Sequence, residues 1–146
     1  MRILPPRLVL ILLAAMVALH LLLPGAALLV LPYNLAGAVV AAAGFAITLS
    51  GARVFSRVGT NIRTFNEPGV LVTDGLFRWS RNPMYLGFVL LLLGTAMLLG
   101  TATPFLAVAL FAVVADRWYI PFEERAMKAK FGADYAAYMH RTRRWI

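Results

Sequence analysis

Two long stretches without a charged side chain constrain this chain more than any other feature of its sequence. No Asp, Glu, Lys or Arg occurs between Arg7 and Arg53, or between Arg81 and Asp116. A helix of about 20 apolar residues, rising ~1.5 Å per residue, crosses the ~30 Å hydrocarbon core of a bilayer. The first stretch, 45 residues long, has room for two crossings, and the second, 34 residues long, exceeds a single one. These stretches predict an all-α integral membrane protein.

Composition points the same way and excludes several classes of function. Only 14% of the residues are charged and 62% are hydrophobic, whereas a soluble domain carries about 25% charged residues. Basic loops beside membrane spans explain the net charge of +8, and no separate basic segment indicates a nucleic-acid partner. The absence of cysteine excludes disulfides and thiolate chemistry. His20 and His140 are far apart in the sequence and suggest no metal site.

Proline and glycine residues divide the apolar stretches into four expected spans. The turn "GTATP" (100–104) separates the last two, and Pro104 suits the first position of a helix. We expect a single membrane domain, 1–146, with spans at 8–23 (or 8–31), 33–54, 83–99 and 104–120, followed by a cytoplasmic helical tail, 121–146.

The basic residues predict the orientation of these spans. They occur before the first span, in the segment 53–81 and in the tail, whereas the other two connections have none. Because basic loops stay on the cytoplasmic side, we expect both termini in the cytoplasm. The first apolar run also imitates a signal peptide, but it is slightly long for one, and we expect it to be retained as a span. The expected location is the inner or plasma membrane of a bacterium or archaeon.

A stripe of small residues follows one face of the expected second span. Its members are spaced 4, 3, 4 and 3 residues apart: Gly37, Ala41, Gly44, Thr48 and Gly51. Gly87 and Gly94 repeat the seven-residue step in the third span. Such stripes let helix backbones approach closely. The stripe predicts helix packing, within one chain or between chains, and leaves the oligomeric state open.

The tail is polar enough to leave the membrane. Pro121 suits a helix start, the two following glutamates suit its first turn, and Gly132 is expected to divide two short helices. Aromatic residues and arginines are mixed in the tail, which suggests helices lying against anionic lipid. These residues are Phe131, Tyr135, Tyr138, Trp145, Arg141, Arg143 and Arg144.

Two polar clusters adjoin the spans on the expected cytoplasmic side. One is Arg81–Gly87, at the start of the third span, and the other is Asp116–Glu124, at the end of the fourth. Because a very short turn joins these two spans, both clusters are expected at the open end of one hairpin, close in space. Taken singly, each residue has an ordinary explanation, such as lipid-headgroup contact for Arg81 or an interfacial aromatic position for Tyr85.

Taken together, the clusters predict a site for a small zwitterionic ligand. Arg81, Asn82 and free helix N–H groups suit a carboxylate. Glu123 or Glu124 suits an ammonium group or ribose hydroxyls. Aromatic side chains of both clusters suit a cation or a ring: Tyr85, Trp118 and Tyr119. Gly87 would let the ligand approach the helix backbone.

The segment "LVTDGLFRWSRNPMYLG" (71–87), together with "PFEERAMKAKFGADYAAYMHRTRRWI" (121–146), resembles the isoprenylcysteine carboxyl methyltransferase family and its phospholipid methyltransferase relatives. The family pattern is R-H-P-x-Y-x-G, then a Glu-Glu pair after the next hairpin, then F-G-x-x-Y-x-x-Y. The resemblance covers roughly residues 70–146. Asn82 stands where many members have His, and an amide does not titrate near neutral pH, which puts a proton-transfer role for this position in doubt.

The resemblance implies S-adenosylmethionine as cofactor, with S-adenosylhomocysteine as product. The residues implied in cofactor binding are Leu71, Val72, Gly75, Arg81, Asn82, Pro83, Tyr85, Leu86, Gly87, Glu123 and Glu124. No catalytic residue is identified, and Asp116 and Arg117 are candidates for orienting the acceptor. The chain has no G-x-G-x-x-G motif, so a soluble Rossmann methyltransferase is not the comparison.

We therefore expect methyl transfer to a lipophilic acceptor at a site facing the cytoplasm, with a lipid or other lipophilic acceptor as partner and the acceptor itself unidentified. Three alternatives stay open: a small four-span transporter, a non-catalytic membrane assembly factor, and a membrane reductase with a similar C-terminal half. The transporter has little support, because His20 is the one titratable group well inside the first two spans.

Overall fold

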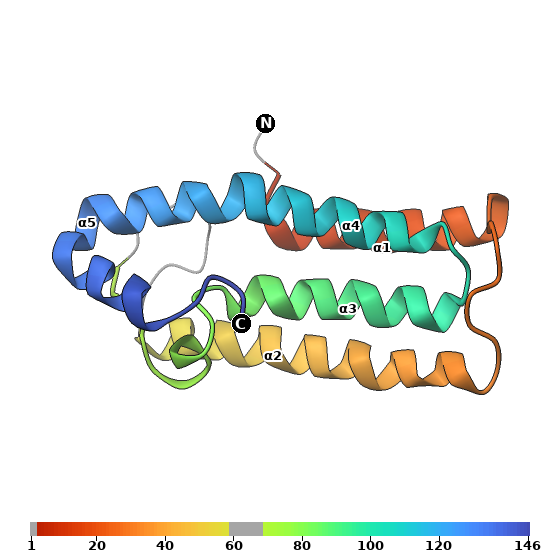
Figure 1. The fold of residues 1–146 in the computed structure, drawn as a ribbon, viewed down its shortest axis with the longest axis horizontal. Coiled ribbons are helices and arrows are strands. Elements are labelled where there is room, and N and C mark those ends of the chain that lie inside the picture. The colour runs from red at the N-terminus through yellow and green to blue at the C-terminus, as the bar shows by residue number, and fades with distance from the viewer. Residues whose placement is uncertain (1–2, 59–68) are drawn as a thin grey trace.

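The computed structural model describes residues 3–58 and 69–146, and it is all-helical over these residues, with no β-strand (Figure 1). The main helices are α1 (Pro5–Leu22), α2 (Ala36–Val58), α3 (Pro83–Leu99), α4 (Pro104–Val114) and α5 (Ile120–Arg141). Two short 3₁₀ helices precede α2 and α3: η1 (Tyr33–Leu35) and η2 (Gly75–Arg78). One π-helical segment, η3 (Ala115–Tyr119), joins α4 to α5.

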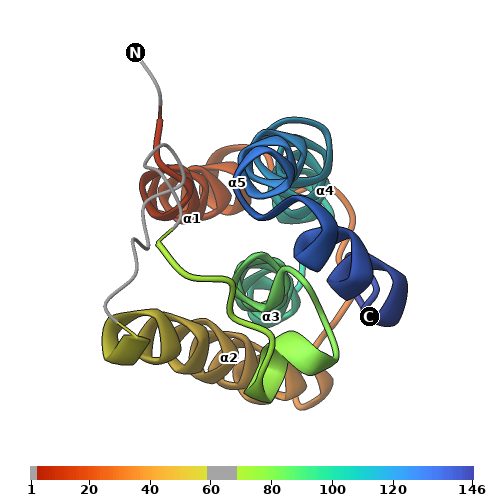
Figure 2. The same ribbon diagram turned by 90° about the vertical axis from the view of Figure 1, so that its left-hand side faces the viewer.

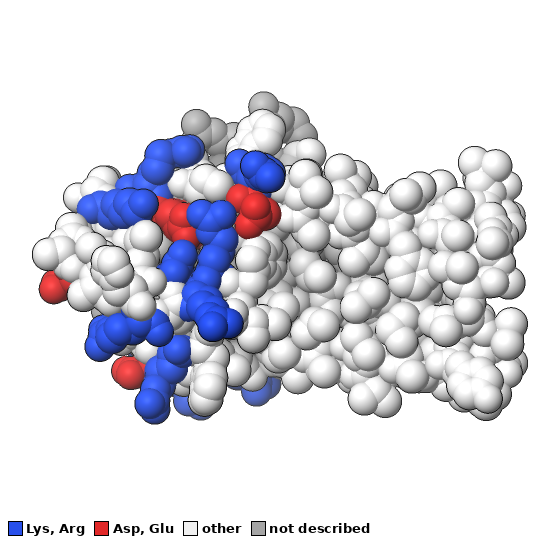
Figure 3. All heavy atoms as spheres, in the orientation of Figure 1, with Lys and Arg blue, Asp and Glu red and all other residues white. Residues whose placement is uncertain are grey.

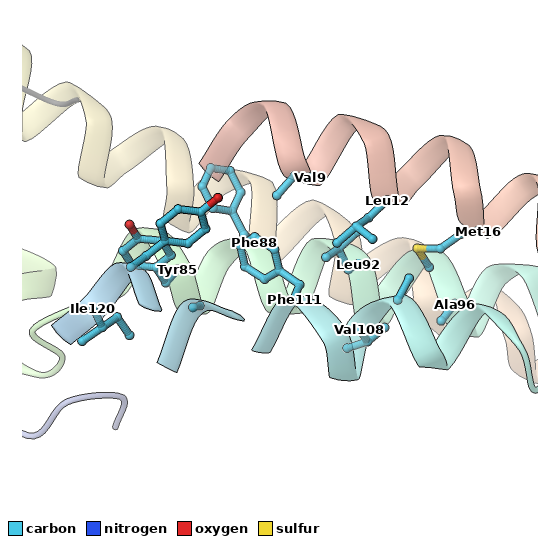
Figure 4. Close-up of a cluster of buried hydrophobic side chains, with 13 residues drawn as sticks. Val9, Leu12, Met16, Tyr85, Phe88, Leu92, Ala96, Val108, Phe111 and Ile120 are labelled. Atoms are coloured by element: carbon cyan, nitrogen blue, oxygen red, sulfur yellow. The ribbon is translucent and has the colours of Figure 1, made fainter. Parts of the chain in front are cut away.

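The helices run side by side along the long axis of the molecule, with α3 at the centre. Seen from the end, α1 and α4 form one layer, α2 lies on the opposite side, and α3 lies between them (Figure 2). The helix α3 packs against α1, α2 and α4. The core between them is apolar, and Met16, Leu92 and Phe111 are fully buried in it (Figure 4). The central place of α3 explains why its first turn can take part in a site.

Helix length and composition support an integral membrane protein. Three helical segments are long and apolar enough to cross a bilayer: Pro5–Leu22, Tyr33–Arg57 and Pro104–Arg141. The fourth apolar helix, α3, has 17 residues, about 26 Å at the rise of an α-helix, which is near the lower limit for a crossing. In Figure 3 the charged side chains gather at the end formed by α5, the end of α2 and the segment before α3, and the rest of the visible face carries none.

The helix boundaries agree in part with the prediction. The helix predicted at 83–99 is α3, residue for residue. The helix at the N-terminus ends at Leu22, so the extension to residue 31 is wrong. Leu23 leaves the helix, and Gly25 adopts a φ of 70°, a left-handed conformation that suits glycine and ends regular helix. The second span begins as predicted at Tyr33 and continues past residue 54 to Val58.

The helix α5 begins at Ile120, one residue from the predicted start at Pro121, but the predicted break from the preceding helix is absent. The chain stays helical from α4 through η3 into α5. A proline in a regular α-helix brings its ring against the carbonyl four residues earlier. The wider π turn ends at Tyr119, two residues before Pro121, and accommodates the ring without ending the helix. The predicted division at Gly132 is confirmed, because this residue has a φ of 46° and kinks α5.

The small-residue stripe packs against α3 of the same chain. A side chain at Gly44 would come within 2.6 Å of the carbonyl oxygen of Gly87, and one at Gly37 or Gly94 would meet the backbone of the opposite helix. The two backbones therefore touch, as small residues allow. This contact answers the question left open by the sequence in favour of packing within the chain.

Candidate functional site

The two predicted polar clusters meet at the charged end of the bundle. The hydroxyl of Tyr85, in the first turn of α3, donates a 2.9 Å hydrogen bond to Oε1 of Glu123 on α5. The guanidinium of Arg81, just before α3, lies 3.0 Å from Oε1 of Glu124. The predicted convergence of the two clusters is confirmed.

The start of α3 is held by residues that follow α5 rather than by a side-chain cap. Asn82 is the N-cap, and its side chain makes no cap hydrogen bond within α3. Its amide instead donates to the carbonyl of Arg144 at 3.0 Å, and its backbone N–H donates to the hydroxyl of Ser80 at 3.1 Å. Pro83 occupies the first turn, where its missing N–H costs nothing. Asn82 thus fixes the helix start by an amide hydrogen bond that needs no titratable group.

Glu124 is a buried carboxylate between two arginines. Its side chain is 9% exposed. Arg81 contacts one carboxylate oxygen, and Arg144 contacts both, at 3.2 Å from Nε to Oε1 and 2.7 Å from Nη2 to Oε2. Burial raises the pKa of Glu124, but the hydrogen bonds and positive charges of Arg144 and Arg81 outweigh it and hold this pKa below its usual value. Glu124 is therefore ionised at neutral pH.

Arg81 ties α3 to the end of α5 through several groups. Its backbone N–H donates to the carbonyl of Arg143 at 2.9 Å. Its Nη1 donates to the carbonyls of Met139 and Thr142. Its Nε is buried and has no hydrogen-bond partner within the part of the chain that the structure describes. A buried guanidinium N–H without a partner is costly, so this atom is a candidate contact for a bound ligand.

Residues 142–146, which we call the strap, run back across the site from the end of α5. Residue Ser80 pairs with Arg143 in a single parallel β-bridge. Two strap side chains then reach Asp116: Nη1 of Arg144 at 3.4 Å and the indole N–H of Trp145 at 3.0 Å. The strap thereby joins the segment before α3, the π segment and α5.

An aromatic pair lies beside the carboxylates. The rings of Tyr85 and Tyr119 are stacked, with centroids 6.0 Å apart and planes 14° apart. The hydroxyl of Tyr119 donates to the carbonyl of Ile3 at 2.8 Å, which joins the π segment to the start of the chain. Both side chains are buried, so the pair forms an apolar surface beside the polar cluster.

The predicted placement of the tail against lipid is wrong for its two tyrosines. Tyr135 and Tyr138 are buried within the protein, and Tyr138 donates a 2.6 Å hydrogen bond to the carbonyl of Phe77 in η2. Burial raises the pKa of Tyr135 to about 12 and that of Tyr138 further. The kink at Gly132 turns this part of α5 back over the segment before α3, where the aromatic residues pack against protein.

Other residues predicted for the cofactor lie at the same end in varied settings. Leu71 and Val72 are half-buried in the segment that leads into η2, and Gly75 begins η2 with a φ of 62°. Leu86 is half-buried on α3. Gly87 faces α2, where a side chain would meet Thr48, so helix packing accounts for this glycine. Cofactor contact by these residues stays a prediction.

The two candidates for orienting an acceptor differ in their surroundings. Asp116 accepts hydrogen bonds from the strap, as described above. The side chain of Arg117 is 84% exposed and lies 3.7 Å from Asp116. His20 lies at the uncharged end, where its Nδ1 is 2.9 Å from the hydroxyl of Thr101. No group of three potential metal ligands occurs among residues 3–58 and 69–146.

Sequence reasoning missed the contribution of the strap. The sequence predicts lipid contact for Arg144 and Trp145 and gives Ser80 no separate role. The signal was present as a dense run of basic and aromatic residues, "RTRRW". The run alone does not reveal which arginine faces the protein, because this depends on the path of the backbone after α5.

Comparison with known proteins gives a consistent result. Residues 33–134 match the family model described as phospholipid methyltransferase. Protein-S-isoprenylcysteine O-methyltransferase B of Arabidopsis thaliana is 40% identical over 75 residues, which are 49% of this chain and 36% of the relative. The corresponding enzyme of Schizosaccharomyces pombe is 38% identical over 76 residues, 50% of this chain and 31% of the relative.

A third relative is shorter. An uncharacterized protein of Haemophilus influenzae is 36% identical over 63 residues, which cover 43% of this chain and the whole of that protein. The chain spans about a third of the length of the two methyltransferases. No solved structure matches the chain significantly.

Proposed function

The chain belongs to the phospholipid methyltransferase family, and we propose that it is a membrane methyltransferase that uses S-adenosylmethionine and acts on a lipophilic acceptor. The observation that carries the proposal is the meeting of Arg81 and Tyr85 with Glu124 and Glu123 at the charged end of an otherwise apolar bundle. Relatives named protein-S-isoprenylcysteine O-methyltransferase match about half of the chain, which supports the same activity.

The residues present fit this cofactor by their chemistry. S-adenosylmethionine bears a carboxylate, an ammonium group and a sulfonium, so its site needs donors, an acceptor carboxylate and an environment that tolerates a cation. Arg81 offers a buried Nε without a partner in the described chain. Glu123 is half-buried beside the stacked pair of Tyr85 and Tyr119. Carboxylates and aromatic faces both stabilise a cation.

In this proposal the residues around the site bind different parts of the cofactor. Arg81 and Asn82 hold the carboxylate of the ligand, and Glu123 holds its ammonium group. When bound, S-adenosylmethionine supplies an electrophilic methyl group on a positively charged sulfur. The backbone at Leu71, Val72 and Gly75 covers the adenosine.

Three residues shape the first turns of α3 without offering a charged group. Pro83 starts the helix, Leu86 is half-buried, and Gly87 packs against α2. In the proposal they place the helix backbone beside the ligand, so that the side chains of the first turn point toward it.

Orientation and exclusion of water supply much of the rate in this proposal. The acceptor reaches the site from the bilayer, and Asp116 and Arg117 orient its polar end. A thiol, carboxylate or amine acceptor needs no dedicated base. The charged end faces the cytoplasm, because basic segments stay on that side; both termini and the site then lie there, with α3 as a fourth, short crossing.

The test is methyl transfer by the purified full chain in nanodiscs made from native lipid. The protein is incubated with S-adenosylmethionine labelled in the methyl group and with a membrane-lipid and metabolite extract, and labelled products are identified by mass spectrometry. Binding of S-adenosylhomocysteine is measured on the same sample by calorimetry. We expect binding and a labelled lipophilic product.

Absence of S-adenosylhomocysteine binding by folded protein would refute the proposal. Binding without any labelled product in extracts from several sources would favour a non-catalytic role. Binding of a nicotinamide cofactor instead would favour the reductase alternative.

A further inference from the structure

We propose that Arg144 is a positioning residue of this site, one that acts on the ligand through Glu124 and the start of α3 and does not touch the ligand itself. The inference rests on the proposed function, because it concerns the same cofactor site. It gives a role to an arginine that lies outside every motif from which the site was predicted.

Arg144 is the single side chain that bridges the two carboxylates Asp116 and Glu124 in the described chain. Its Nη2 lies 2.7 Å and its Nε 3.2 Å from the oxygens of Glu124, and its Nη1 lies 3.4 Å from Asp116. The two acids are eight residues apart on one continuous helix, on either side of Pro121. A fork of this geometry holds both carboxylates in fixed orientations.

Glu124 depends on this contact because it is buried. Its side chain is 9% exposed, and its other cation, Arg81, is 11% exposed. A buried carboxylate is tolerated when its charge is paired and its lone pairs are hydrogen-bonded. Arg81 contacts only one oxygen of Glu124, so Arg144 supplies the partner of the second.

The backbone of Arg144 acts at a second place. Its carbonyl accepts hydrogen bonds from the amide of Asn82 at 3.0 Å and the hydroxyl of Ser80 at 3.5 Å. The position of Arg144 therefore fixes both Asn82, the N-cap of α3, and the carboxylate of Glu124 on α5. Tyr85 lies in the first turn after that N-cap, and its hydroxyl meets Glu123, the neighbour of Glu124. Displacing Arg144 is expected to loosen the pair that faces the ligand.

Lysine would not replace Arg144 fully. An ammonium group is a compact point charge, whereas the planar guanidinium presents several donors at fixed angles. A lysine at this position would retain the charge beside Glu124 but would not bridge to Asp116. Partial rescue by lysine is thus a signature of positioning by the bridge.

The chain offers a matched control in the next residue. Arg143 belongs to the same strap and is exposed, and its side chain forms no ion pair with any described residue. Replacing it by glutamine removes the same charge from the same segment and leaves the bridge intact.

The experiment measures binding of S-adenosylhomocysteine to the full chain in nanodiscs at pH 7.0 and 5.5. The variants are Arg144→Gln, Arg144→Lys and Arg143→Gln, each confirmed as folded by a cooperative thermal transition. We expect Arg144→Gln to weaken binding about 10- to 100-fold, by analogy with the loss seen when residues that support metal ligands are replaced. We expect Arg144→Lys to lie between wild type and Arg144→Gln, and Arg143→Gln to match wild type.

The pH arm separates positioning from a general loss of structure. In Arg144→Gln, Glu124 keeps Arg81 and faces Tyr135 and the strap without its second cation, so it is expected to take up a proton more easily. The affinity of the Arg144→Gln variant for S-adenosylhomocysteine should then fall further between pH 7.0 and 5.5. The wild type serves as reference for all other titrating groups, including exposed His140.

The outcomes that would overturn the role of Arg144 as a positioning residue are as follows. Unchanged affinity in folded Arg144→Gln, or equal loss in Arg144→Gln and Arg143→Gln, would overturn the inference. If Arg144→Gln does not fold, an affinity of Arg144→Lys equal to wild type overturns it as well. Failure of the wild type to bind S-adenosylhomocysteine would instead refute the proposed function, so the two failures are distinguishable.

Discussion

Tyr85 and Glu123 are hydrogen-bonded across 38 residues, with 2.9 Å between the phenol oxygen and Oε1 of the carboxylate. The bond joins the first turn of α3 to α5. The next acid, Glu124, points instead to Arg81 and Arg144 and is buried. The two adjacent glutamates thus have different surroundings: Glu124 is buried and joins α5 to Arg81 and Arg144, whereas Glu123 is half-buried and is the glutamate that we propose as the ligand contact.

Replacing Tyr85 by phenylalanine tests the hydrogen bond between Tyr85 and Glu123. The ring still stacks on Tyr119, but the carboxylate of Glu123 loses one hydrogen-bond donor. We expect the affinity for S-adenosylhomocysteine to fall about three- to tenfold, the equivalent of one hydrogen bond of about 1 kcal/mol. Calorimetry in nanodiscs measures the change. Tyr33→Phe, at the uncharged end, is the control and should bind as wild type; equal binding by both variants would contradict the assignment.

The two glutamates are expected to respond differently to the same substitution. Glu124→Gln leaves Arg81 with a weaker, uncharged partner inside the protein and should lower the free energy of unfolding by about 2–3 kcal/mol. This expected loss of stability is no larger than the cost of breaking a fully buried ion pair, because Arg144 stays in contact with water. Glu123→Gln should change stability by less than about 1 kcal/mol and weaken ligand binding.

Thermal unfolding in nanodiscs and ligand titration, made on both variants, measure the two effects separately. Similar melting temperatures for Glu123→Gln and Glu124→Gln would argue against this division of roles. Loss of ligand binding in Glu124→Gln alone would assign the ligand to the other glutamate.

The sequence predicted the fold where strong local signals stand at both ends of an element. The helix α3 begins at Pro83 and ends at Leu99, just before Gly100, which adopts the left-handed conformation with a φ of 73°. Its boundaries follow from these two residues. The meeting of the polar clusters was also predictable, since the short turn before Pro104 leaves the hairpin little freedom.

The sequence did not predict the path of the chain after Ile120. Proline usually starts or ends a helix, so a continuous helix through Pro121 requires the π turn that precedes it. The single bridge between Ser80 and Arg143 joins residues far apart in the chain and has no periodic pattern to announce it. The contacts of Asp116 with Arg144 and Trp145 of the strap also join distant residues, so the sequence does not predict them.

The contact between α2 and α3 gives a prediction about packing. In Gly44→Ala the added Cβ would stand 2.6 Å from the carbonyl oxygen of Gly87, too close for a real contact. The helices must separate, and we expect a loss of about 1–3 kcal/mol, typical of overpacking. Thermal unfolding measures it. Ala43→Val, at an exposed position of α2, is the control, and an equal effect of both changes would contradict close packing at Gly44.

The pH dependence of stability follows from the lowered pKa of Glu124. The carboxyl has an ordinary pKa of 4.5 in the unfolded chain and a lower one in the folded protein. The unfolded state therefore binds the proton first as the pH falls. The stabilisation by ionised Glu124 is fully present above about pH 5 and is lost as the pH falls from about 4.5 through the folded pKa.

We expect the melting temperature of the wild type to be level between pH 7 and 5 and to fall below pH 4.5. Glu124→Gln carries no titrating group at this position, so its curve should fall less steeply over the same range. The difference between the two curves isolates the contribution of Glu124 from those of the other acids. Parallel curves for wild type and Glu124→Gln would mean that the arginine pairs of Glu124 do not hold its pKa below 4.5.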